Sequence, residues 1–251
     1  MIQVRDLSKS FGGVRVLHDV DLDVPEGEVT CIIGRSGSGK SVLMRHLIGL
    51  LTPDAGKVVV DGAPLAELTY SELRLVRRKF GVLFQGGALF DSMSARENVE
   101  FPLSTFTDLS RKEVRARADE CLELVELPDA GAKMPADLSG GQQKRVALAR
   151  AIAIEPKYIL YDEPTSGLDP ETSNTIDELI HRLGTTMGTT SVVVTHDMHS
   201  VLAIADRIAF VYDGTIHWTG TVADLHRADD PTLLDFVRAN EYKIGVPSET
   251  A

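Results

Sequence analysis

The sequence is poor in cysteine and in basic side chains, and it has no long apolar run. Its two cysteines, Cys31 and Cys121, lie in patterned apolar segments without a CxxC neighbour, so we expect reduced core thiols and no disulfide framework. The 26 Lys and Arg fall short of the 37 Asp and Glu, and this net charge of -11 disfavours nucleic acid as a partner. The 21 Gly and 11 Pro are scattered, which excludes collagen-like and low-complexity classes.

The apolar runs are of strand length, and none approaches the roughly 20 residues that a membrane helix needs. Charges at Arg5, Asp6 and Lys9 leave no room for the apolar core of a signal peptide. We therefore expect a cytoplasmic protein. If it acts at a membrane, another subunit must hold it there.

Strand and helix patterns alternate along the chain, which implies an α/β fold with a mostly parallel sheet. The predicted strands cover residues 2–7, 14–24, 28–33, 57–61, 158–161 and 191–195, with a hairpin over 208–218. The predicted helices cover 42–51 and 142–154, with others that begin after Thr69, Ser110, Asp169 and Asp230; Gly184 is the expected end of the third of these. A charged helical insert over about 86–155 is expected to form a separate lobe.

Residues 34–41 read GRSGSGKS and fit the P-loop pattern G-x-x-x-x-G-K-S/T. Glycines let backbone N–H groups curl around phosphate oxygens, and the following helix presents its positive N-terminus. Lys40 would reach the β- and γ-phosphates, and Ser41 would offer its hydroxyl to Mg²⁺. A Gly/Ser turn before a helix is the alternative, but the strand before it favours the P-loop. The predicted ATP-binding residues here are Gly34, Arg35, Ser36, Gly37, Ser38, Gly39, Lys40 and Ser41.

Residues 158–163 read YILYDE, an apolar strand that ends in two acids and fits the Walker B pattern. A buried strand would deliver Asp162 to the magnesium shell and Glu163 to the attacking water. Strands often end in acids, so this pattern gains its weight from the P-loop in the same chain.

Residues 138–142 read LSGGQ, followed by a helical pattern and then by Asp162-Glu163. A flexible turn that caps a helix is the alternative, but motifs in this order resemble the ATP-binding-cassette (ABC) ATPases over about residues 2–225. The resemblance implies a P-loop NTPase fold with an antiparallel β subdomain at the N-terminus and an inserted helical lobe. We expect one domain over 1–245, with a core of about 1–85 and 156–225 and the signature lobe over about 86–155. Residues 226–251 are expected to form a C-terminal helix and a loose tail.

Further site residues are implied by this resemblance. Gln85 matches the glutamine that touches the metal and senses the transport subunit, and His196 matches the switch histidine that holds the γ-phosphate. Phe11 occupies the position that stacks on adenine, although a core phenylalanine is the alternative. The implied catalytic residues are Lys40, Gln85, Glu163 and His196; the implied magnesium ligands are Ser41, Gln85 and Asp162; the further ATP-binding residues are Phe11, Ser139, Gly140, Gly141, Gln142 and Asp169.

The resemblance also implies partners. ATP would lie between the P-loop of one chain and Ser139–Gln142 of a second copy, in a head-to-tail, ATP-dependent homodimer. A membrane permease would dock near residues 85–101 and hold the dimer at the cytoplasmic face of the cell membrane, with an accessory regulatory subunit as a further partner. ATP and Mg²⁺ are the expected cofactors.

The run over residues 82–103, VLFQGGALFDSMSARENVEFPL, resembles the ATPases of Mla/Mce-type lipid transporters. Gln142 departs from that subfamily, in which methionine is frequent at this position. An importer ATPase for small polar solutes and a soluble, non-transport ABC ATPase are the alternatives. A P-loop kinase or GTPase is disfavoured by LSGGQ together with Asp162-Glu163.

Overall fold

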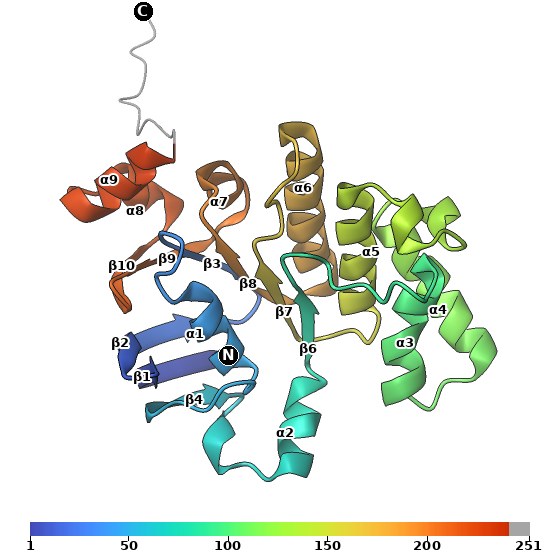
Figure 1. The fold of residues 1–251 in the computed structure, drawn as a ribbon, viewed down its shortest axis with the longest axis horizontal. Helices are drawn as coiled ribbons and strands as arrows, with labels where there is room; N and C mark the ends of the chain where they lie inside the picture. The colour runs from blue at the N-terminus through green and yellow to red at the C-terminus, as the bar shows by residue number, and fades with distance from the viewer. Residues whose placement is uncertain (241–251) are drawn as a thin grey trace, which may run out of the picture.

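The computed structural model describes residues 1–240, which form two β-sheets flanked by helices (Figure 1). The strands are β1 (Ile2–Phe11), β2 (Val14–Val24), β3 (Val29–Ile33), β4 (Ala55–Val60), β5 (Ala63–Pro64), β6 (Phe80–Leu83), β7 (Tyr158–Asp162), β8 (Thr190–Thr195), β9 (Arg207–Tyr212) and β10 (Thr215–Gly220). The α-helices are α1 (Lys40–Leu47), α2 (Tyr70–Arg77), α3 (Ala95–Phe106), α4 (Arg111–Leu124), α5 (Gly140–Ile152), α6 (Pro170–Met187), α7 (Met198–Ile204), α8 (Val222–His226) and α9 (Pro231–Ala239).

The central sheet has six strands in the order β10-β9-β3-β8-β7-β6. All neighbours pair in parallel except β9 and β10, which form the predicted hairpin. Strands β3, β7 and β8 are buried along their whole length, as expected for parallel strands covered on both faces. The second sheet is antiparallel, in the order β2-β1-β4-β5. The expected α/β fold with an antiparallel N-terminal sheet is confirmed.

Alternate residues of the central strands face two different hydrophobic clusters. Ile32, Leu160 and Val192 pack against the antiparallel sheet, α1 and α2, whereas Cys31, Ile159 and Val193 face the side that carries α3 to α9. The two-residue side-chain period of a strand therefore builds a core on each face of the sheet. Within the described residues both cysteines are free and buried, as predicted.

Helices α3, α4 and α5 pack on one another at the side of the central sheet remote from the antiparallel sheet (Figure 1). The inserted helical lobe is thereby confirmed, and the residue limits of the domain and its parts stay a prediction. Capping boxes begin α2 at Thr69 and α4 at Ser110, as the sequence predicted. Three further capping boxes, which were not predicted, begin α3 (Ser94 with Glu97), α5 (Ser139 with Gln142) and α8 (Thr221 with Asp224).

Three helix ends differ from the prediction, and one of them is that of α5, which ends at Ile152 rather than Ile154. Helix α1 ends at Leu47 rather than Leu51, because Gly49 turns the chain with a φ of 65°. Helix α6 runs through Gly184 to Met187, because the left-handed residue that ends it is Gly188, with a φ of 62°. The predicted loose tail after about residue 245 lies outside the described residues.

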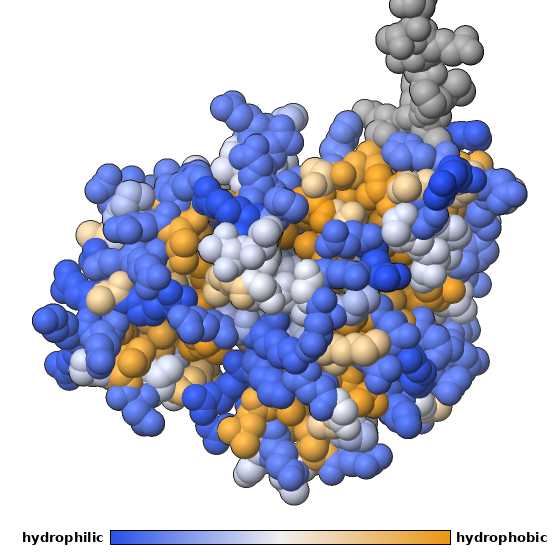
Figure 2. Space-filling view, turned by 180° about the vertical axis from the view of Figure 1, so that it is seen from behind, coloured by the Kyte–Doolittle hydropathy of each residue, from blue (hydrophilic) through white to orange (hydrophobic). Residues whose placement is uncertain are grey.

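The surface seen from behind is predominantly hydrophilic, with separate apolar patches, one of them at the lower edge where Figure 1 places α2 (Figure 2). Among residues 1–240, no helix combines the length and the hydropathy that a bilayer crossing requires.

Candidate active site

The P-loop connects β3 to α1 and curls back toward its own helix. Gly34 must be glycine, since a Cβ there would lie 2.4 Å from the carbonyl oxygen of Val211. Lys40, the first residue of α1, is 7% exposed and donates from Nζ to the carbonyls of Gly34 at 2.7 Å and Arg35 at 3.0 Å. Burial lowers the pKa of Lys40, whereas the charges of Glu163 and Asp162 oppose this shift. The loop thus surrounds a cation beside a row of backbone amides, which suits a polyphosphate.

A hydroxyl and a carboxylate meet next to the P-loop. Ser41 Oγ donates to Asp162 Oδ1 at 3.0 Å, and Asp162 is the buried last residue of β7. Because parallel strands present their carboxyl ends at one edge, β3 and β7 bring these two residues together from distant parts of the chain. Hard oxygen donors of this kind fit Mg²⁺, which binds through one or two protein ligands plus waters and substrate phosphates.

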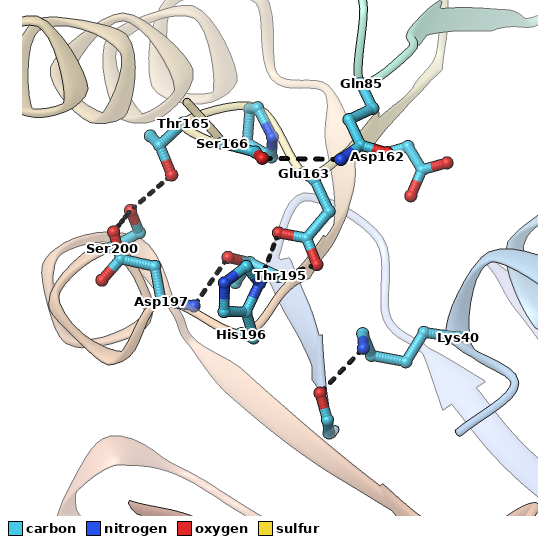
Figure 3. Close-up of polar contacts among 12 residues, drawn as sticks. Lys40, Gln85, Asp162, Glu163, Thr165, Ser166, Thr195, His196, Asp197 and Ser200 are labelled. Atoms are coloured by element: carbon cyan, nitrogen blue, oxygen red, sulfur yellow. Dashed lines mark hydrogen bonds and ion pairs between the residues drawn. The ribbon is translucent and has the colours of Figure 1, made fainter. Parts of the chain in front are cut away.

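Glu163 and His196 form a hydrogen-bonded pair in the same region (Figure 3). The Nδ1 atom of His196 lies 2.9 and 3.0 Å from the two carboxylate oxygens of Glu163. Glu163 follows β7 with a φ of 50°, and its N–H donates to Val194 O in β8 at 2.8 Å. Its side chain is 14% exposed and that of His196 is 55% exposed. The neighbouring strand therefore holds the Glu163 backbone in a left-handed conformation that is strained for a non-glycine residue.

One cavity of about 490 Å³ brings together half of the predicted site residues. Its predicted members are Arg35, Ser36, Gly37, Gly39, Lys40, Ser41, Gln85, Glu163 and His196. Gln85 Nε2 lies 3.5 Å from Ser166 Oγ, in the loop that follows Glu163 (Figure 3). Phe236, Ala239 and Asn240, in and just after α9, also line the cavity, together with Val16 and Val42. Sequence reasoning placed this helix at Asp230-Pro231 but had no signal for its position beside the P-loop.

Other predicted residues lie outside this cavity. Phe11 ends β1, is exposed, and packs its ring 5.5 Å from Lys9 Nζ. Ser139 caps α5, with its Oγ accepting from the N–H of Gln142 at 3.3 Å. Asp169 caps α6 by accepting from the N–H of Thr172 at 3.0 Å. Within one chain, Ser139–Gln142 are therefore absent from the lining of the P-loop cavity.

The segment after Gln85 borders a separate groove of about 620 Å³ between α2, β6, α3 and α5. Ala88 and Phe90 line this groove and are exposed, whereas Leu89 packs against the core. The floor carries Phe80, Phe84, Phe101 and Phe106, and the cationic side chains along the groove are Arg74, Arg77, Arg78 and Arg150. None of these three residues is fully buried, and only Leu89 packs partly against the core, so the segment does not behave as a core segment.

The geometry agrees with comparisons to known proteins. A family model described as ABC transporter matches residues 17–166. The "Probable ribonucleotide transport ATP-binding protein mkl" of Mycobacterium leprae is 40% identical over 97% of this chain and 70% of its own length. The methionine import ATP-binding protein MetN of Caulobacter vibrioides is 44% identical over 96% of this chain and 73% of its own. The intermembrane phospholipid transport system ATP-binding protein MlaF of Haemophilus influenzae is 39% identical over 95% of this chain and 90% of its own.

Comparison with solved structures also finds ATP-binding cassettes. A dimeric ATP-binding cassette in a post-hydrolysis state, bound to ADP and Pi, superposes with a TM-score of 0.82. It is 38% identical and covers 88% of this chain and 99% of its own. The match of sequence, fold and P-loop geometry shows that this chain belongs to the ABC transporter family, as one of its ATP-hydrolysing, ATP-binding subunits.

Proposed function

We propose that this ATPase powers a membrane permease that transports phospholipid. The hydrolytic part of the proposal is carried by one observation, the convergence of Lys40, the Ser41–Asp162 pair and the Glu163–His196 pair around the P-loop. The lipid part is supported by the resemblance over residues 82–103 and by the relative MlaF, which is named for intermembrane phospholipid transport. Relatives named for methionine import and ribonucleotide transport make a polar-solute importer the second candidate.

Nucleotide binding is assigned to the P-loop. Lys40 exchanges its two carbonyl partners for the β- and γ-phosphates, and the loop amides of residues 34–41 donate to phosphate oxygens. Mg²⁺, when bound, neutralises phosphate charge and helps to align the reacting oxygens. Ser41 and Gln85 would supply its direct protein ligands, and Asp162, which accepts a hydrogen bond from Ser41, would act through water.

Hydrolysis converts ATP and water into ADP and phosphate. Glu163 accepts a proton from the attacking water, a role for which a positioned base contributes about 10²–10⁴ in rate. His196 orients this carboxylate through Nδ1, which leaves its other ring nitrogen for the γ-phosphate. The strained backbone of Glu163 keeps the base at the edge of the sheet, where the phosphates would lie.

A second copy of the chain completes the site. Ser139–Gln142 begin α5 and do not line the P-loop cavity of their own chain, so in this proposal they contact a nucleotide held by a second copy. Gly141 packs so closely on α6 that a Cβ there would lie 2.3 Å from Thr172 Cγ2. We infer the head-to-tail dimer from this placement, and the dimeric ADP- and Pi-bound relative supports it.

The permease is proposed to dock in the groove beside Gln85. Its floor is aromatic and its cationic side chains are arginines, so it fits a short amphipathic helix with an apolar face and acidic residues. Ala88 and Phe90 come three and five residues after Gln85 in sequence. Movement of a docked helix can therefore displace Gln85, the proposed magnesium ligand, because only a few residues separate Gln85 from the groove. We place the dimer at the cytoplasmic face of the membrane through this contact.

The test is affinity purification of the tagged protein from solubilised membranes, with identification of the proteins and lipids that co-purify. We expect an integral membrane permease together with enriched phospholipid, and ATP-dependent movement of labelled phospholipid once the complex is in vesicles. ATP-dependent uptake of a polar solute with no lipid movement would favour the importer. Recovery of the protein alone, with full ATPase activity, would favour a soluble ABC ATPase.

A further inference from the structure

Helix α5 contains a buried lysine, Lys144, whose ammonium group makes all of its hydrogen bonds to one loop. Lys144 is 6% exposed, and its Nζ donates to the carbonyls of Glu163 at 3.3 Å, Pro164 at 2.6 Å and Ser166 at 2.8 Å. An ammonium group has three donors, so these carbonyls satisfy it completely. The loop in question begins at the proposed catalytic base.

This loop is folded around the ammonium group. Glu163 has a φ of 50° and Gly167 a φ of 77°, and the N–H of Ser166 turns back to Glu163 O at 3.2 Å. Three carbonyl oxygens consequently converge on one point. Their partial negative charges repel one another unless a positive charge lies between them. Burial lowers the pKa of Lys144, and the Glu163 charge opposes this shift and favours the ammonium form.

The same helix begins at the residues expected to meet the partner chain. Ser139 caps α5, and Lys144 follows the cap by little more than one turn. A helix turn is stiff, so a displacement of the Ser139 end moves Nζ and the carbonyls bonded to it. Contact with nucleotide at one end of α5 is thereby linked to the backbone that carries Glu163.

We propose that Lys144 is a positioning residue for ATP hydrolysis. It fixes the position of the Glu163–Ser166 backbone relative to Ser139–Gln142 at the start of α5. The proposal rests on the proposed role of Glu163 as the base. Lys144 acts through that loop and is absent from the lining of the P-loop cavity, so it affects turnover and not nucleotide binding.

The experiment measures kcat and KM for ATP in Lys144→Met, with thermal unfolding in parallel. Methionine keeps the length of the side chain but donates nothing to the three carbonyls. We expect kcat to fall about 10- to 100-fold, since small displacements of a catalytic group have effects of this size. KM should change less than about 3-fold, because the P-loop contacts are untouched. The kcat of Lys144→Gln, whose amide keeps two donors, should lie between those of Lys144→Met and the wild type. If Lys144→Met does not fold, the kcat of Lys144→Gln tests the proposal in its place.

Arg145→Met is the matched control. Arg145 is the next residue of α5 and also donates to backbone carbonyls, but to those of Val125 and Glu126 at 3.4 and 3.3 Å, away from the catalytic loop. It should lose thermal stability and keep kcat. Equal losses of kcat in Lys144→Met and Arg145→Met, or a wild-type kcat in Lys144→Met, would overturn the proposal. Glu163→Gln is measured beside them, and full activity there would remove the base itself and the positioning role with it.

Discussion

Glu163 occupies a backbone conformation that costs a non-glycine residue about 1–3 kcal/mol. The cost is tolerated because its N–H is tied to β8 at Val194 and its carbonyl to Lys144. These bonds fix the backbone, and His196 fixes the carboxylate. Both the main chain and the side chain of Glu163, the proposed catalytic base, are thus held in place by hydrogen bonds.

Replacement of Glu163 by glutamine should separate binding from hydrolysis. The amide is nearly isosteric but cannot accept the proton of water, so we expect turnover to fall at least about 100-fold. ATP affinity should stay near that of the wild type, because Lys40 and the loop amides are unchanged. Fluorescent-nucleotide binding and phosphate release report the two quantities. Lys40→Ala is the counterpart that should lose nucleotide affinity, and hydrolysis by Glu163→Gln at the wild-type rate would contradict the assignment.

Asp177 predicts a pH dependence of stability. It is 5% exposed on α6, and burial raises its pKa to about 6, with the Asp197 charge adding to the shift and a hydrogen bond with Ser200 opposing it. A raised carboxyl pKa means that the folded state holds a proton that the unfolded state has lost between about pH 4 and pH 6. The free energy of unfolding contributed by this group therefore decreases as pH rises through that window.

The neutral variant Asp177→Asn should escape this loss. Its stability relative to the wild type should improve by up to about 3 kcal/mol between pH 4 and pH 7, since two pKa units correspond to that free energy. Urea unfolding of both proteins at each pH measures the difference, and titrations common to both cancel. A difference that does not vary with pH would show that Asp177 is ionised equally in the folded and unfolded states.

Helix α5 is the element that contacts both the loop after Glu163 and the segment that borders the groove. Lys144 holds the loop after Glu163, and Arg150 donates to the carbonyls of Gly87 and Ala88 at 2.8 Å each. Burial lowers the pKa of Arg150, the cost of placing a guanidinium between the helix and the groove. A single rigid helix consequently contacts both the groove segment and the catalytic loop.

A charge in the groove should separate docking from catalysis. Ala88 is exposed at the groove and already has a φ of 48°, so glutamate there adds an acidic group without a new backbone requirement. We expect Ala88→Glu to lose co-purification with membranes and to keep most of its basal ATPase activity. The desolvation of a carboxylate against an apolar partner face is the physical reason.

Leu109→Glu is the matched control for Ala88→Glu. Leu109 is an exposed apolar residue just before α4 and lines a different cavity, so this variant should co-purify normally. Unchanged co-purification of Ala88→Glu would contradict docking at the groove. Loss of both docking and ATPase activity would show that the segment supports the fold.

At the scale of the whole molecule, one chain holds only part of the proposed site. Ser139–Gln142 do not line the P-loop cavity of their own chain, and in the proposed head-to-tail dimer a second copy would bring them to it. Each protomer carries a net charge of -11, so closure brings together two like-charged bodies. Contacts to the nucleotide must overcome that repulsion.

ATP should therefore drive dimerisation of Glu163→Gln, which traps the nucleotide. Sedimentation velocity with and without Mg-ATP measures the shift from monomer to dimer. Ser139→Arg on this background should block it by placing bulk and charge against the partner's P-loop. Ser110→Arg is the control, because it removes an equivalent helix cap at α4, outside the proposed interface. A fully active protein that stays monomeric at saturating ATP would contradict the composite site.

The sequence by itself determined the family and the kind of chemistry. Phosphate binding demands glycines, a lysine and a hydroxyl at fixed spacing, so GRSGSGKS can be recognised without coordinates. Strand and helix periods determined the α/β class, and capping boxes located the starts of α2 and α4. Such signals are local, because each depends on residues within a few positions of one another.

The tertiary structure alone decided which distant residues meet. The pairing of Glu163 with His196, the three bonds of Lys144 and the approach of Phe236 to the P-loop join segments whose separation along the chain says nothing about distance. It also placed Phe11 outside the P-loop cavity and left Leu89 partly buried between the exposed Ala88 and Phe90. These contacts follow from strand order and from helix packing on the sheet. Both are set by the collective burial of two hydrophobic cores, which no short motif encodes.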